Sequence, residues 1–159
     1  MALVAYATLA EGDAHATAKI SAILENAICE PQPQLRKGAF AAGRYLNEAS
    51  DGVILGVLAG LRDPDPVVSV AAFGTLAIRK NWRLSSAHWR VLIMAAQTME
   101  RSGPPAVRRQ LASTLVTLAD RCPADQREKL GLILDSLRND ICSSVRIAAN
   151  ANHPTGDRG

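Results

Sequence analysis

The segment LRDPDPVVSVAAFGTLAI, which spans residues 61–78, decides how the rest of the chain can fold. Pro64 and Pro66 cannot lie inside a helix, whereas Asp63 and Asp65 suit a turn or a helix N-cap. The segment therefore predicts the end of one helix, a tight turn and a second helix. Apolar residues recur every four positions along the second helix and share one face, namely Val68, Ala72 and Leu76.

One such helical face cannot form a core alone, and the same pattern recurs along the chain. Five anchor positions begin equivalent helices at spacings of 34, 33, 39 and 38 residues, a period typical of stacked helical hairpins. We therefore predict an all-α fold of about four to five helical hairpins, in which Phe40 and Phe73 are core residues and Leu76 and Leu115 are buried between hairpins. The anchors are Met1, Leu35, Val68, Val107 and Val145.

A partner helix is expected before each later anchor, which makes about nine helices and no strand. Residues 1–151 are predicted to form the repeat domain, and the polar residues 152–159 a disordered tail. The partner helices are expected from Asp13 to about Cys29, from Asp51 to Arg62, after a cap at Ser85 or Ser86, and from a first turn at Pro123.

Three stretches, residues 61–72, 104–112 and 137–149, resemble HEAT repeats, and the last two contain the typical Val-Arg pair. Ser69 departs from the pattern because it stands where Arg is usual, and Gly43 replaces the leucine of other repeats. The resemblance implies an armadillo-like α-solenoid, an α-α superhelix whose second helices line a concave face. It also implies that Arg108 and Arg146 bridge to a turn acid such as Asp63 or Asp140. It implies no single activity, since HEAT proteins serve as scaffolds, carriers and nucleic-acid binders.

Composition excludes several classes of protein. No apolar run approaches the roughly 18 residues of a membrane span, and the apolar start lacks the positive flank of a signal peptide, so we expect a cytoplasmic chain. Three cysteines without a CxxC pair fit buried thiols in a reducing compartment. The histidines stand far from the cysteines in sequence, so no metal and no cofactor are predicted. The residues concerned are Cys29, Cys122, Cys142, His15, His88 and His153.

Basic residues concentrate in the middle of the chain. Residues 62–110 contain eight Lys or Arg against three acids, whereas the whole chain has a net charge of only +3. We predict a non-catalytic protein-protein interaction or scaffold module that binds a protein partner through a concave, centrally basic surface, and the charge of this surface makes an acidic partner one candidate. Nucleic acid is the alternative ligand, disfavoured by the small surplus of charge and the few aromatics. A solvated surface with internal Asp–Arg pairs also stays open. The candidate residues are Lys37, Arg44, Arg79, Lys80, Trp82, Arg83 and Arg109, with Trp82 expected to be partly exposed.

Two further predictions concern catalysis and the N-terminal end. Catalysis needs a nucleophile, a base and an orienting group that converge in a pocket. No histidine falls at a matching repeat position, His88 is expected on the surface, and the sequence has no Gly-rich phosphate loop or HExxH motif, so we predict no enzymatic activity. The face formed by Leu3, Tyr6 and Leu9 is apolar, whereas solenoid ends are normally polar. Self-association through this end is therefore expected.

Overall fold

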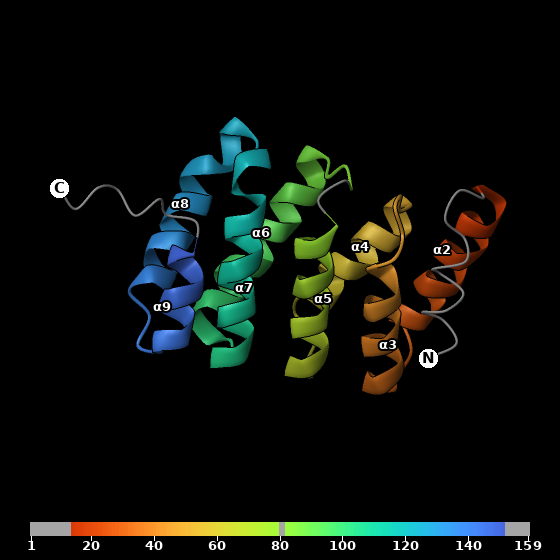
Figure 1. The fold of residues 1–159 in the computed structure, drawn as a ribbon, viewed down its shortest axis with the longest axis horizontal. Coiled ribbons are helices and arrows are strands. Elements are labelled where there is room, and N and C mark those ends of the chain that lie inside the picture. The colour runs from red at the N-terminus through yellow and green to blue at the C-terminus, as the bar shows by residue number, and fades with distance from the viewer. Residues whose placement is uncertain (1–13, 80–81, 152–159) are drawn as a thin grey trace.

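A computed structural model describes residues 14–79 and 82–151 of the chain (Figure 1). The expected helix at Met1, the apolar face of Leu3, Tyr6 and Leu9, and the expected tail at 152–159 all lie outside these residues, as does Lys80. The described part contains eight α-helices and no strand, which confirms the all-α prediction.

The helices alternate as the first and second members of four hairpins. Their boundaries agree with the expected ones to within a few residues, although α4 ends at Gly60 rather than at Arg62. The short 3-10 helix η1 (Ala119–Arg121) follows α7. The hairpins are α2 (Ala14–Ile28) with α3 (Pro33–Gly43), α4 (Asp51–Gly60) with α5 (Pro66–Ile78), α6 (Ser86–Ser102) with α7 (Pro105–Leu118), and α8 (Ala124–Arg138) with α9 (Ser143–Asn150).

The helices form two rows. The second helices α3, α5, α7 and α9 stand side by side, and each contacts the next along the row (Figure 1). The first helices α2, α4, α6 and α8 form the other row in the same order. We call these the second-helix row and the first-helix row. Each hairpin therefore contacts mainly its neighbours in sequence.

The helix starts follow from local sequence. The Asp65 side chain accepts a hydrogen bond from the backbone N–H of Val67 at 2.8 Å, and so caps α5. Ser85 caps α6 by accepting from the N–H of His88 at 3.2 Å, which confirms the predicted cap. Prolines occupy the first helical position in three of the second helices, where their missing N–H costs nothing: Pro33, Pro66 and Pro105.

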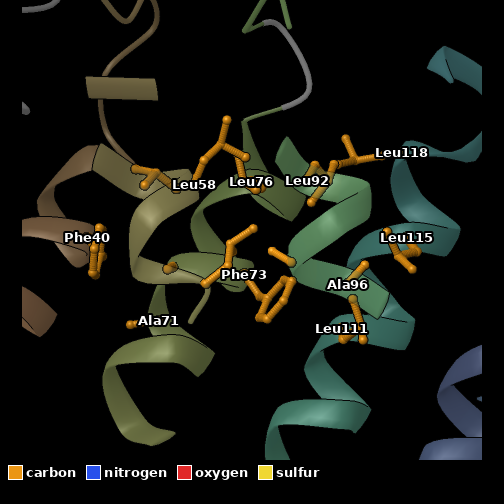
Figure 2. Packing of buried hydrophobic residues seen from close by; sticks show 14 of the residues in the cluster. Phe40, Leu58, Ala71, Phe73, Leu76, Leu92, Ala96, Leu111, Leu115 and Leu118 are labelled. Carbon is orange, nitrogen blue, oxygen red and sulfur yellow. The ribbon is translucent and has the colours of Figure 1, made fainter. Parts of the chain in front are cut away.

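Apolar side chains fill the space between the rows (Figure 2). Leu76 and Leu115 are buried, as the repeat register predicts, and so are Phe40 and Phe73. Ala, Leu and Val dominate this core, and small residues allow helices to approach closely. The ring of Phe40 lies where a side chain on Gly60 of the next hairpin would clash with it.

Two kinds of polar contact recur between hairpins. Arg36 donates to the carboxylate of Asp63 through Nε and Nη2, at 2.7 and 2.9 Å, and Arg108 pairs with Asp140 in the same way. Buried threonine hydroxyls also donate to the main-chain carbonyl of the preceding second helix. These bonds are Thr75 to Phe40 O at 2.8 Å and Thr114 to Phe73 O at 3.0 Å.

The Arg–Asp pair is missing at the junction between the second and third hairpins. Ser69 stands where Arg36 and Arg108 stand in the other hairpins, and its hydroxyl donates to Leu61 O at 2.7 Å. Ser102 occupies the register position of the turn aspartate. Both halves of the pair are therefore replaced together, by two uncharged serines.

Candidate functional site

Charge is divided unequally between the two rows. The second helices α3, α5, α7 and α9 carry five Lys or Arg residues and no Asp or Glu. The first helices carry acids and bases in equal number, six of each. The second-helix row is therefore basic and the first-helix row neutral, but only two of the five row cations, Arg108 and Arg109, come from the basic segment 62–110.

Three of the five cations on the second-helix row are used within the fold. Arg36 and Arg108 bind turn aspartates, and the bond from Arg108 holds the pKa of the Asp140 carboxyl below its usual range. Arg146 donates to the carbonyl oxygens of Asp140 and Ile141. The family resemblance implies that Arg146 binds a turn carboxylate, but within the described residues it binds carbonyl oxygens instead.

The remaining two cations, Lys37 and Arg109, are exposed, and neither forms an ion pair within the described ranges. Both lie opposite the buried side of their helices. They occupy equivalent repeat positions on α3 and α7, and the equivalent residue on α5, between them, is half-buried Val70. The row therefore presents two cations at one level, with an apolar residue between them.

Arg44 joins this surface from the end of α3. Its Nη2 lies 3.5 Å from the carbonyl oxygen of Ala71 on α5, over Gly74, where a Cβ atom would clash with the guanidinium. Its Nε is buried and has no hydrogen-bond partner in the described part of the chain. Arg44 therefore places over α5 a cation that has no carboxylate partner within the described ranges. We call the surface formed by Lys37, Arg44, Val70 and Arg109 the basic face.

The other predicted cations lie elsewhere. Arg79 donates from Nη1 to the side-chain oxygen of Asn47 at 3.2 Å, beyond the C-terminal end of α5. Arg83 is exposed and lines a pocket of about 370 Å³, whose lining also includes the acids Glu48 and Asp51. Lys80 lies outside the described residues. Of the candidate cations in the described ranges, Lys37, Arg44 and Arg109 thus lie on the basic face, and Arg79 and Arg83 lie apart from it.

The prediction that Trp82 is partly exposed is wrong. Only 2% of Trp82 is accessible, and its indole N–H donates to the carbonyl oxygen of Leu46 at 3.0 Å. The ring also lies near Gly43. Gly43 replaces the leucine of other repeats, and the indole occupies space near its missing side chain. Trp82 is thus a core residue and not an interface residue.

The prediction of a surface histidine at position 88 is also wrong. His88 is 5% exposed, and its Nδ1 accepts from the backbone N–H of Ser85, which completes a capping box at the start of α6. Its Nε2 lies 3.9 Å from Asp51. This histidine has a structural role, because it satisfies a helix-terminal N–H.

Nucleophiles and metal ligands do not gather in the described ranges. Cys29 is exposed, Cys122 is buried and Cys142 is half-buried. No group of three His, Cys, Asp or Glu residues is placed to hold a metal ion in that part of the chain. None of its helices is long and apolar enough to cross a membrane. The prediction that the chain is not an enzyme stays a prediction.

Comparisons with protein-family models, with curated proteins and with solved structures found no significant match to this chain. The HEAT resemblance therefore stays a prediction from the sequence. The lack of acids in the four described second helices was not among the sequence-based predictions. The acid content of each expected helix carries this signal, whereas the net charge of longer segments does not.

Proposed function

We propose that this chain is a HEAT-like α-solenoid that acts as a non-catalytic interaction module and binds an acidic protein segment. The solenoid assignment is supported by the regular hairpin spacing and by the two rows of helices. The Arg–Asp pairs and the threonine-to-carbonyl bonds also recur in register between hairpins. Repeat folds of this kind offer long, continuous surfaces to their partners.

The observation that carries the proposal is that the four described second helices contain no acids. Two of their cations, Lys37 and Arg109, also form no ion pair within the described ranges. A solvated structural surface usually mixes both signs of charge, as the first-helix row does. A surface of one sign speeds encounter with a partner of the opposite sign and disfavours partners of the same sign.

The repeat geometry indicates which features the partner has. Lys37 and Arg109 lie two helix spacings apart, which is about 16–20 Å because packed helices lie about 8–10 Å apart. An extended segment covers this span in about five or six residues. The partner is therefore an acidic segment with carboxylates near both ends of such a span. Apolar side chains between them would contact Val70, and a further carboxylate could reach Arg44.

Nucleic acid is the alternative ligand, and two observations disfavour it. The basic face has only three cations, which allows few phosphate contacts. Base stacking needs exposed aromatic rings, and among the described residues Tyr45 alone is exposed, at 41%, whereas Trp82, Trp89, Phe40 and Phe73 are buried. The net charge of +3 is also small.

The test compares two double charge reversals with the same change in net charge. Lys37→Glu with Arg109→Glu alters the basic face, while Arg62→Glu with Arg90→Glu alters two exposed cations outside the second-helix row. The probes are a fluorescent Glu- and Leu-rich peptide, a Lys-rich peptide and a single-stranded DNA oligonucleotide, each followed by anisotropy at low and raised salt.

We expect the acidic peptide to bind the wild type and the control pair equally, and to bind the basic-face pair at least tenfold more weakly. Raised salt should weaken wild-type binding. An equal loss of peptide affinity in both double variants would mean that binding depends on net charge alone and not on the basic face, which contradicts the proposal. Stronger binding of DNA than of the peptide would favour the alternative. Unchanged melting temperatures would show that both pairs remain folded.

A further inference from the structure

Arg146 on α9 makes only part of the contacts that its equivalents make. Its Nη1 donates to two carbonyl oxygens of its own turn, those of Asp140 and Ile141, at 2.7 and 3.0 Å. Arg36 makes the same two bonds within its own turn, at 2.8 and 2.7 Å, and also uses Nε and Nη2 to bind Asp63 of the next hairpin. The Nε and Nη2 edge of Arg146 has no carboxylate partner in residues 14–79 and 82–151.

Glu30 is the matching carboxylate at the other end of the described chain. Its carbonyl oxygen accepts from Arg36 six residues later, just as the carbonyl oxygen of Asp140 accepts from Arg146. Glu30 therefore occupies the turn position of Asp63 and Asp140. Unlike those two aspartates, it is exposed, and its carboxylate has no partner in the described ranges.

The hairpin that contains Glu30 also has an uncovered apolar position. Val68, Val107 and Val145 are at most 1% exposed, whereas the equivalent Leu35 is 46% exposed. The later hairpins each have a described hairpin before them, and the first does not. In the later hairpins, the side that carries the turn position equivalent to Glu30 and the buried valine packs against the preceding hairpin. The same side of the α2–α3 hairpin, with Glu30 and Leu35, has no described hairpin packed against it.

We propose that two copies of this chain stack head to tail, with Arg146 of one copy bound to the Glu30 carboxylate of the next. The contact repeats the register of Arg36 with Asp63 and of Arg108 with Asp140. The occupant is a second copy because one chain carries both halves of the pair, one at each end of the described rows. Such a contact leaves one end of each copy free, so the assembly is open and grows with concentration.

The assembly is expected to be weak and sensitive to salt, because exposed ion pairs contribute little and are screened. Sedimentation velocity of the full chain at rising concentration and low salt provides the measurement. We expect the weight-average mass of the wild type to rise above 16.9 kDa. Arg146→Glu alone and Glu30→Arg alone should each stay at that mass, because like charges then meet at the contact.

An equimolar mixture of the two variants is the decisive sample. Arg146→Glu chains carry acids at both ends and Glu30→Arg chains carry bases, so the mixture restores opposite charges at every contact. We expect the mixture to associate at least as strongly as the wild type. Arg109→Glu, which changes net charge as Arg146→Glu does but lies on the basic face, should associate like the wild type.

Three outcomes would overturn the proposal. They are a wild type that stays monomeric at the highest concentration, single variants that associate normally, and a mixture that stays monomeric while both variants are folded. Glu30→Arg changes a side chain without a described partner, so its effect stays interpretable even if Arg146→Glu loosens the last turn.

Discussion

Arg108 donates two hydrogen bonds to the carboxylate of Asp140, from Nε at 2.6 Å and from Nη2 at 3.0 Å. Its Nη1 donates at the same time to the carbonyl oxygen of Gly103, at 2.6 Å. One side chain therefore links the turn of its own hairpin to the turn of the next. Asp140 also accepts from the backbone N–H of Cys142, which fixes that second turn.

Replacing Asp140 by Asn should lower the free energy of unfolding by about 1–3 kcal/mol at pH 7, because a hydrogen bond between charged, largely buried groups is lost. Urea unfolding followed by circular dichroism measures the change. Asp120→Asn, at an exposed acid on the 3-10 helix η1, should change the free energy of unfolding by less than about 0.5 kcal/mol. An Asp140→Asn protein as stable as the wild type would contradict the role of the pair.

The same pair predicts a dependence on pH. The bonds from Arg108 hold the pKa of Asp140 below its ordinary value near 4. The carboxylate therefore stabilises the fold fully above about pH 4, and this contribution is lost as the pH falls through the lower pKa of the folded state. The stability gap between wild type and Asp140→Asn should be constant from pH 7 to 5 and shrink below pH 4. A gap that does not change with pH would contradict this.

Two glycines provide a matched test of how closely the hairpins approach. A Cβ on Gly60 would clash with the Phe40 ring, whereas a Cβ on Gly38 meets nothing within 4 Å. We expect Gly60→Ala to destabilise the protein by about 1–3 kcal/mol through overpacking. Gly38→Ala should stabilise it by about 0.4–1 kcal/mol, because alanine favours a helix. If the melting temperatures of both variants changed in the same direction, this would contradict the close packing of Phe40 against Gly60 between the first and second hairpins.

Leu115 tests the core between the rows. It is fully buried, so Leu115→Ala should cost about 2–5 kcal/mol in the free energy of unfolding. Leu132 on α8 is 66% exposed, and Leu132→Ala should cost less than about 0.5 kcal/mol. Equal losses in urea unfolding would mean that the burial pattern is wrong.

The three thiols should react with a thiol reagent at different rates. Burial raises the pKa of the Cys122 thiol, whereas a hydrogen bond with Ser144 lowers the pKa of Cys142. Because the thiolate is the reactive form, Cys142 and the exposed Cys29 should react in the folded protein and Cys122 only on unfolding. Cys29→Ser and Cys142→Ser should each remove one early equivalent. Three equivalents in the folded wild type would contradict the buried site.

The local elements were predictable from the sequence because their causes are local. The four-residue period places Leu76 and Leu115 on a buried face, and the buried state of both confirms that register. Ser85 could be recognised as a cap because a capping residue binds the N–H groups that directly follow it. The all-α class follows from the same patterns.

The predictions for Trp82 and His88 were wrong because the environment of each side chain comes from residues distant in the sequence. Trp82 lies in a connecting segment and was expected to be partly exposed. Its indole N–H, however, donates to the carbonyl oxygen of Leu46, 36 positions earlier, and its ring lies near Gly43. His88 lies on a polar part of its helix, but it is buried where the start of α6 approaches Asp51 on α4. Neither approach is encoded in the neighbouring residues.

The sequence by itself determined the helices, their period and the cations available for binding. Only the tertiary structure decided which cations are free, because pairing depends on distances between atoms that lie about 30 residues apart in the chain. Arg36 and Arg108 bind carboxylates across hairpin junctions, whereas Lys37 and Arg109 meet none in the described ranges. Stacking the hairpins in register places one turn's acid beside the preceding hairpin's arginine, and leaves Lys37 and Arg109 on the outer side of the second-helix row.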